Sequence, residues 1–171
     1  METNTARPYG SQKEQALARL DAGLRNRLIL VTAPEGYGKT ALLRQWAAAL
    51  QGAIPVAWVS LEPGCNRMDR FLTQVWSAIH AAGLGDVPVE LPGSEMIDLA
   101  NALAGVEEDF ALILDQYHVI YTQVVHAAVS LLLDYPPRGL HIVIACRSEP
   151  PLQIPRLRAR RQLVELGPSD F

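Results

Sequence analysis

A turn with the composition of a phosphate-binding loop lies near the start of the chain, at residues 33–40. It reads Ala-Pro-Glu-Gly-Tyr-Gly-Lys-Thr, which fits the Walker A pattern except that Ala33 replaces its first glycine. Such a loop surrounds an anion with backbone N–H groups and a helix N-terminus, and Lys39 adds a charge that reaches the outer phosphates. The Thr40 hydroxyl suits Mg²⁺, which binds a few protein oxygens together with phosphate oxygens. Alanine is acceptable at position 33 if its φ is negative.

The residues on both sides of this turn provide the context that the motif requires. Residues 28–32 are an apolar run of the buried-strand type. After the loop, apolar residues at i, i+3, i+4 and i+7 from Leu43 indicate one buried face of a helix. An ordinary strand-to-helix turn with a surface lysine is the alternative, but the order strand, loop, helix favours phosphate binding. The residues expected to contact phosphate are Glu35, Gly36, Tyr37, Gly38, Lys39, Thr40 and Ala41.

The rest of the chain alternates apolar strand patterns with helical patterns. Strands are predicted at 28–32, 55–61, 111–114, 140–145 and 163–166, and helices at 12–24, from Leu43 to Leu50, from Phe71 to near Gly83, from an N-cap at Ser94 to Ala104, and from Val125 to Leu132. Continuous apolar strands separated by helices indicate a parallel sheet covered on both faces and joined by right-handed crossovers.

The predicted fold class is therefore α/β, a three-layer P-loop NTPase fold with a mainly parallel sheet of about five strands. Residues 1–10 are predicted to be a flexible N-terminal segment, and residues 11–171 to be one nucleotide-binding domain. Three prolines between 150 and 155 are expected to interrupt the chain after the fourth strand. Residues 156–161 then form one or two helical turns, with Leu157 packed inward and the arginines directed to solvent or to acidic neighbours.

Four polar residues follow the ends of four different predicted strands. They are Lys39, Glu62, Asp115 and Arg147. Because ligands of open α/β sheets bind outside the carboxyl ends of the strands, these residues are expected to meet at one edge. Asp115, directly after an apolar run, has the form of the acid that coordinates Mg²⁺ in phosphate-loop proteins.

Arg147 and Gln116 bear on whether a bound nucleotide is sensed at its γ-phosphate and hydrolysed. Arg147 is either a sensor of the γ-phosphate or one half of a surface ion pair with Glu149. The position after the Mg²⁺ acid often carries a second carboxylate that orients the attacking water, and here it is Gln116. An amide orients water but does not take its proton. Glu62 is a substitute base or simply an exposed turn residue, so hydrolysis is less well supported than binding.

The composition is that of a globular protein and disfavours a nucleic-acid-binding or membrane-spanning one. The chain has 171 residues, of which 49% are hydrophobic and 19% charged, and its net charge is −3. An acidic balance disfavours direct DNA binding by this domain. Cys65 and Cys146 are expected to be small core residues in a reducing compartment. The sequence has no membrane-span or signal-peptide pattern, which favours a cytoplasmic location. The four histidines (His80, His118, His126 and His141) have no metal-ligand spacing and are interpreted as structural.

A family resemblance covers nearly the whole chain. Six segments of the chain resemble the N-terminal domain of MalT-like regulators. They are residues 27–40, the string Ala-Trp-Val-Ser-Leu-Glu at 57–62, Arg70-Phe71, the string Leu-Ile-Leu-Asp-Gln-Tyr-His at 112–118, and the blocks 147–152 and 157–166. These regulators are LuxR-type, ATP-dependent transcriptional activators of the STAND class of P-loop NTPases. The family usually has Asp-Asp-Tyr-His where this chain has Asp-Gln-Tyr-His, which puts catalysis in question.

The resemblance implies a nucleotide-operated switch. ADP would hold a resting state, ATP with an inducer would favour self-association of the full-length protein, and a slow ATPase would reset it. Lys39 and Thr40 would bind phosphates and Mg²⁺, Asp115 would bind Mg²⁺, and Arg147 would sense the γ-phosphate. Pro8 and Tyr9 are expected to contact the base. A binding module with little hydrolysis and a metabolic phosphotransferase are the alternatives. The winged-helix, helical-repeat and DNA-binding helix-turn-helix domains that the family implies have no counterpart in these 171 residues.

Overall fold

The computed structural model describes residues 9–84 and 96–171. Its helices are α1 (Tyr9–Gly23), α2 (Lys39–Leu50), α3 (Met68–Ala81), α4 (Met96–Ala104), α5 (Gln123–Asp134) and α6 (Ile154–Ala159). Its strands are β1 (Leu28–Thr32), β2 (Val56–Ser60), β3 (Phe110–Asp115), β4 (Leu140–Cys146) and β5 (Leu163–Leu166). Three short 3-10 helices complete it: η1 (Pro63–Asn66), η2 (Tyr117–Val119) and η3 (Pro168–Asp170).

All five strands form one parallel sheet in the order β2-β3-β4-β1-β5. Strand β4 lies between β1 and β3, so that Ile144 is opposite Leu30 on one side and Leu114 on the other. The ends of β1, β3 and β4 therefore lie next to one another at one edge of the sheet. This confirms the predicted α/β fold with a parallel sheet of five strands.

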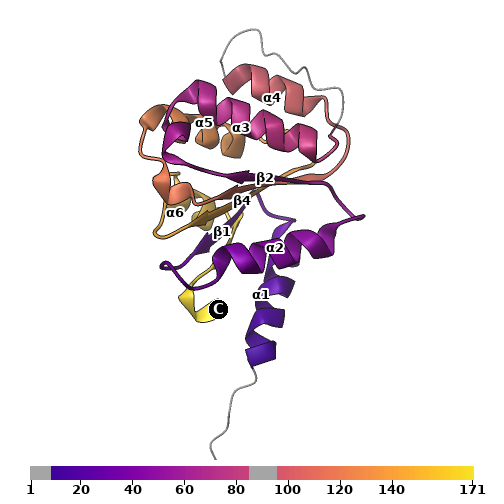
Figure 1. Cartoon of the computed structure of the whole chain (residues 1–171), viewed down its shortest axis with the longest axis vertical. Coiled ribbons are helices and arrows are strands. Elements are labelled where there is room, and N and C mark those ends of the chain that lie inside the picture. The colour runs from indigo at the N-terminus through magenta and orange to yellow at the C-terminus, as the bar shows by residue number, and fades with distance from the viewer. Residues whose placement is uncertain (1–8, 85–95) are drawn as a thin grey trace, which may run out of the picture.

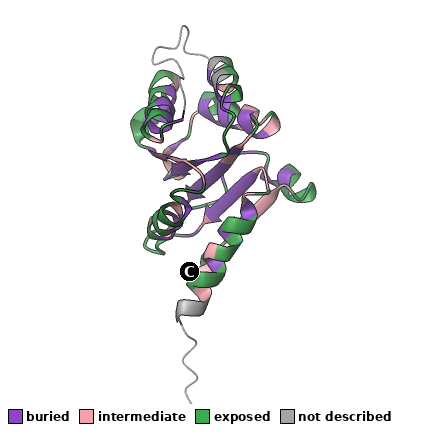
Figure 2. Ribbon diagram, turned by 90° about the vertical axis from the view of Figure 1, so that its right-hand side faces the viewer, coloured by how far each residue is buried: buried purple, intermediate pink, exposed green. Residues whose placement is uncertain are grey.

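Helices cover both faces of the sheet and give the three layers seen in Figure 1. Alternate residues of β1 show how the sheet serves both layers, because successive side chains of a strand point to opposite faces. Leu28 and Leu30 pack in the core below α3, α4, α5 and α6, whereas Ile29 and Val31 pack against α1 and α2. Figure 2 shows the buried strands between helices whose outer surfaces are exposed.

A few boundaries differ from the sequence prediction. Pro155 does not interrupt the chain but lies in the first turn of α6, where the missing N–H has no helical partner to lose. Residues 85–95 lie outside the described residues, and with them the predicted Ser94 cap. Leu157 of α6 is buried, and Arg158 pairs with Glu149 and Glu165, as expected for a packed helix with outward arginines. None of the helices in the described part of the chain combines the length and apolarity needed to cross a membrane.

Candidate nucleotide-binding site

The loop between β1 and α2 has the backbone of an open cradle. Gly36 and Gly38 have φ values of 83° and 85°, a left-handed region in which side-chain-bearing residues are strained. A Cβ at either glycine would meet no atom within 4 Å, so the space above the loop is free for a ligand. Ala33 is buried and does not have a positive φ, which meets the condition for alanine in this position. Its N–H donates to the Cys146 carbonyl (3.3 Å) and ties the loop to β4.

Lys39, at the first position of α2, is folded back over the loop. Its ammonium donates to the carbonyl oxygens of Ala33 (2.6 Å) and Pro34 (2.8 Å). These two contacts hold the charge at the rim of the cradle. A phosphate above the loop would offer the same ammonium a charged acceptor, and hydrogen bonds between charged partners are the stronger kind.

Thr40 and Asp115, which are 75 residues apart in sequence, meet below the cradle. The Thr40 hydroxyl donates to Asp115 Oδ2 at 2.9 Å, and Asp115 Oδ1 accepts the backbone N–H of Gln116 at 2.9 Å. Asp115 is only 2% exposed. A hydroxyl and a buried carboxylate side by side form the hard-oxygen donor set that Mg²⁺ prefers, so these residues fit that ion.

Arg147, the residue after β4, reaches the loop from the other side. Its guanidinium forms an ion pair with Glu35 (3.1 Å), and both side chains are substantially exposed. The alternative prediction, a pair with Glu149, is wrong, because Glu149 pairs with Arg158 at 2.9 Å. An arginine held at the rim of the cradle is within the region where an outer phosphate would extend.

The two candidates for orienting water are placed differently. Gln116 is exposed, follows Asp115 in a left-handed conformation (φ 62°) and precedes η2. Glu62 is exposed where β2 ends, one residue after Leu61, whose N–H donates to the Asp115 carbonyl (3.0 Å). Within the described residues, no hydrogen bond joins the Glu62 side chain to the loop, to Asp115 or to Arg147. The structure thus gathers the loop, Asp115 and Arg147, with Glu62 one strand away.

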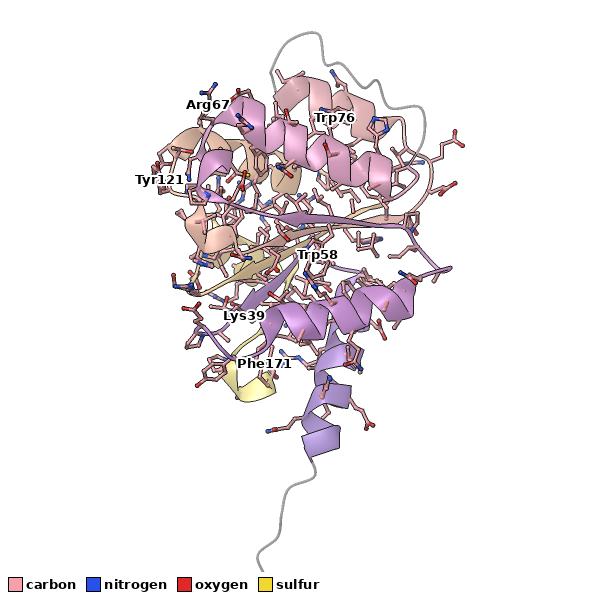
Figure 3. All side chains as sticks on the ribbon, in the orientation of Figure 1. Lys39, Trp58, Arg67, Trp76, Tyr121 and Phe171 are labelled. Carbon is pink, nitrogen blue, oxygen red and sulfur yellow. The ribbon has the colours of Figure 1, made fainter. Side chains whose placement is uncertain are left out.

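A cavity of about 220 Å³ opens beside the loop. It is bounded by the loop and α2, by the first turns of α1, and by the C-terminal segment, and its lining residues are Gln12, Lys13, Tyr37, Gly38, Ala41, Leu42, Asp170 and Phe171. Figure 3 shows Phe171 below the start of α2, close to Lys39. Arg19 of α1 holds this segment through contacts with the Asp170 carboxylate and the Glu165 carbonyl. The walls are mostly apolar, with polar groups at the α1 side.

His118 belongs to this site although its sequence spacing did not indicate it. Burial lowers the pKa of its imidazole, and the charges of Arg147 and Lys39 lower it further, while Glu35 and Asp115 act in the opposite direction. The imidazole ring therefore lies in the electrostatic field of the charged groups of the site. The only sequence signal is its place three residues after Asp115.

Comparison with known proteins agrees with this geometry. No family model matches the chain. The HTH-type transcriptional regulator MalT of Cronobacter sakazakii is 35% identical over 173 residues, and that of Klebsiella pneumoniae is 34% identical over 169 residues; each alignment covers 93% of this chain. The chain is homologous to the N-terminal region of MalT. It spans 18% of the length of these curated relatives.

Solved structures agree on the fold. Cdc6p from Pyrobaculum aerophilum superposes with a TM-score of 0.62 at 15% identity, covering 96% of this chain and 47% of that one. The Aeropyrum pernix Orc1 protein, solved in complex with DNA, also gives 0.62, at 18% identity and with 96% and 46% coverage. The MalT-like chain therefore has the fold of P-loop NTPases.

Proposed function

We propose that this MalT-like domain binds Mg²⁺–ATP and ADP as the switch of a transcriptional regulator, with slow ATP hydrolysis resetting it. The observation that supports this best is the 2.9 Å hydrogen bond between Thr40 and Asp115. It brings together, from the phosphate loop and from the end of β3, the two oxygen ligands that a nucleotide-bound Mg²⁺ needs.

Each part of the nucleotide has a matching part of the site. The backbone of residues 35–41 and the Lys39 ammonium hold the phosphates. Thr40 and Asp115 hold Mg²⁺, which neutralises phosphate charge when it is bound. Arg147 senses the γ-phosphate by exchanging its partner Glu35 for a phosphate oxygen. The partner of Arg147, at the end of β4, would then depend on whether the bound nucleotide has two or three phosphates.

The base is assigned to the 220 Å³ cavity beside the loop. A planar, largely apolar ring system with polar edges suits a cavity of this lining. Gln12 and Lys13 of α1 are the nearest polar groups for the edge of the base. The contacts expected from Pro8 and Tyr9 remain predictions, because Pro8 lies outside the described residues and Tyr9 is the first residue of α1.

A second candidate function is a nucleotide-binding module with little hydrolysis. Gln116 favours it, since this exposed amide follows Asp115 where an acid would serve as a base. Catalysis would then depend on orienting water with Gln116 or Glu62 and on charge neutralisation by Arg147. Turnover separates the two functions, because a module of this kind binds ATP without converting it.

Homology supports a regulatory context for this domain. The chain matches regulators about five times its own length, so a longer protein would supply DNA-binding and signal-sensing domains. We propose that the ATP-bound domain favours self-association of that protein, and that it does not itself contact DNA. Its net charge of −3 supports the latter.

Nucleotide titration of the 171-residue chain tests the proposal. Thermal unfolding is followed with ADP, ATP and GTP, with and without Mg²⁺, beside single-turnover hydrolysis of ATP. A ligand at a hundredfold excess over its Kd stabilises the native state by about 2.7 kcal/mol, which raises Tm by roughly 5–11 °C for a chain of this size. Absence of a shift with every nucleotide would refute the proposal, and a shift without turnover would select the binding module.

Two substitutions make this test specific. Lys39→Ala should remove the ATP-induced shift while leaving the unliganded Tm nearly unchanged, because Lys39 contacts only loop carbonyls in the described structure. Arg25→Ala is the matched control, since it removes an exposed positive charge from the turn after α1. Equal loss of the shift in both variants would mean that general charge, and not the loop, holds the nucleotide.

A further inference from the structure

One ring nitrogen at the site has no partner. His118 Nδ1 is buried and makes no hydrogen bond to any of the described residues. Buried polar atoms in folded proteins are nearly always paired, and an exception at a functional site calls for an explanation. The second ring nitrogen, Nε2, is not buried in this way, and the side chain as a whole is partly exposed.

The segment that carries this ring is held firmly on both sides. The Tyr117 hydroxyl and His126 Nδ1 form a buried hydrogen bond of 3.0 Å. The Val119 carbonyl accepts a hydrogen bond of 2.8 Å from the Asn66 side chain. Because the residues before and after His118 are both anchored, the backbone that carries the ring has little freedom to move out of η2.

This position is at the end of the sheet where the phosphate loop lies. The helix η2 packs against β4, the strand that ends one residue before Arg147. The charges that act on the His118 ring are those of Arg147, Lys39, Glu35 and Asp115. These groups come from the end of β4, the phosphate loop and the end of β3. Since η2 begins two residues after Asp115 and packs against β4, His118 lies at the same end of the sheet as the phosphate site.

The unpaired Nδ1 also fixes which nitrogen carries the proton. A buried N–H without an acceptor is rarer and less favourable than a buried acceptor without a donor. The neutral ring therefore places its hydrogen on Nε2, the accessible nitrogen. Since burial and two nearby cations disfavour the charged ring, His118 presents an uncharged N–H donor to the site at neutral pH.

We propose that His118 is a specificity-determining residue that donates its Nε2–H to the terminal phosphate of ATP. With Arg147 it distinguishes ATP from ADP, and its contribution requires the γ-phosphate. This inference rests on the proposed nucleotide function and adds a residue that the loop motif does not contain. It also gives a reason for the anchored backbone of η2, because a donor that reports one phosphate must be positioned before the nucleotide binds.

Binding measurements on two isosteric variants test this role. The amide N–H of glutamine reaches about as far as Nε2, whereas that of asparagine reaches only as far as Nδ1. Dissociation constants for Mg²⁺–ADP and for the non-hydrolysable Mg²⁺–AMPPNP are measured by calorimetry. His118→Asn should weaken AMPPNP binding about 10- to 150-fold, the range for one hydrogen bond to a charged group. ADP binding should change less than about twofold, and His118→Gln should recover most of the AMPPNP affinity.

The controls separate this inference from the function on which it rests. His80→Gln changes an exposed histidine at the end of α3 and should leave both constants unchanged. If the wild-type chain binds neither nucleotide, the proposed function is wrong. If it binds both, and His118→Asn keeps the wild-type ratio of the two constants or loses both equally, the role of His118 is refuted and the function stands.

Discussion

Asn66 should be one of the most stabilising polar residues of this domain, although it lies outside the nucleotide site. It is the last residue of η1 and is 8% exposed. Its amide donates to the carbonyls of Pro63 (3.0 Å) and Val119 (2.8 Å), and its Oδ1 accepts the N–H groups of Tyr121 (2.7 Å) and Thr122 (3.1 Å). The side chain thus joins the segment after β2 to the segment after β3. Figure 3 shows the labelled side chains Arg67 and Tyr121 on this side of the molecule.

The expected cost of Asn66→Ala follows from these four contacts. A typical intramolecular hydrogen bond contributes about 1 kcal/mol, and more when its loss leaves a buried partner unpaired. At about 1 kcal/mol for each bond, the four contacts sum to about 4 kcal/mol. Water can reach the exposed end at Tyr121, so the expected loss in the free energy of unfolding is about 2–4 kcal/mol. For 171 residues this lowers Tm by roughly 4–16 °C.

Urea unfolding and thermal unfolding, both followed by circular dichroism, measure this loss. Asn66→Asp should lie between the wild type and Asn66→Ala, because the carboxylate accepts from the two N–H groups but faces two carbonyls. Asn101→Ala, on the exposed surface of α4, is the control and should change stability by less than about 0.5 kcal/mol. If Asn66→Ala also stays within about 0.5 kcal/mol of the wild type, the four hydrogen bonds of the Asn66 side chain do not stabilise the folded state as expected.

Three further predictions concern the loop, the core and pH. Gly38→Ala should lose most of the nucleotide-induced shift in Tm, because φ of 85° strains alanine by about 1–2 kcal/mol; an unchanged shift would contradict the loop geometry. Phe110→Ala, at a fully buried position of β3, should lower the free energy of unfolding by about 3–5 kcal/mol in urea. Burial lowers the pKa of His126 and His141, so below about pH 6.5 the unfolded chain binds more protons than the folded one. Stability in urea should therefore fall between pH 7.5 and pH 5.5, and His126→Gln should reduce that fall.

The sequence predicted what depends on neighbours along the chain. The phosphate loop, the strand before it and the helix after it are local patterns, and the structure has all three. Apolar runs without alternation indicated strands buried on both faces, hence a parallel sheet with two helical layers. Cys65 and Cys146 were expected to be small core residues, and both are buried and free. Such patterns are readable because burial and backbone geometry act at fixed spacing.

The sequence also indicated that the candidate site residues follow the ends of several strands, but it did not give the order of the strands in the sheet. The order β3-β4-β1 brings Asp115 to Thr40 and Arg147 to Glu35. Glu62, which follows the edge strand β2, remains one strand away from that centre. Strand order depends on how whole crossovers pack, and no local spacing records it. For this reason Glu149 was offered as a partner of Arg147, when Arg158 was the nearer cation.

Tertiary structure alone decided the features that complete the site. The cavity that we propose for the base needs α1, the phosphate loop and the C-terminal segment together. The hydrogen bonds of the Asn66 side chain to the segment after β3 join residues more than fifty positions apart. The position of His118 depends on the packing of η2 against β4. The sequence by itself determined the phosphate-loop motif and its place between a strand and a helix. Which side chains surround the loop was decided by the tertiary structure, because hydrogen bonds and charges act through space between groups that are far apart along the chain.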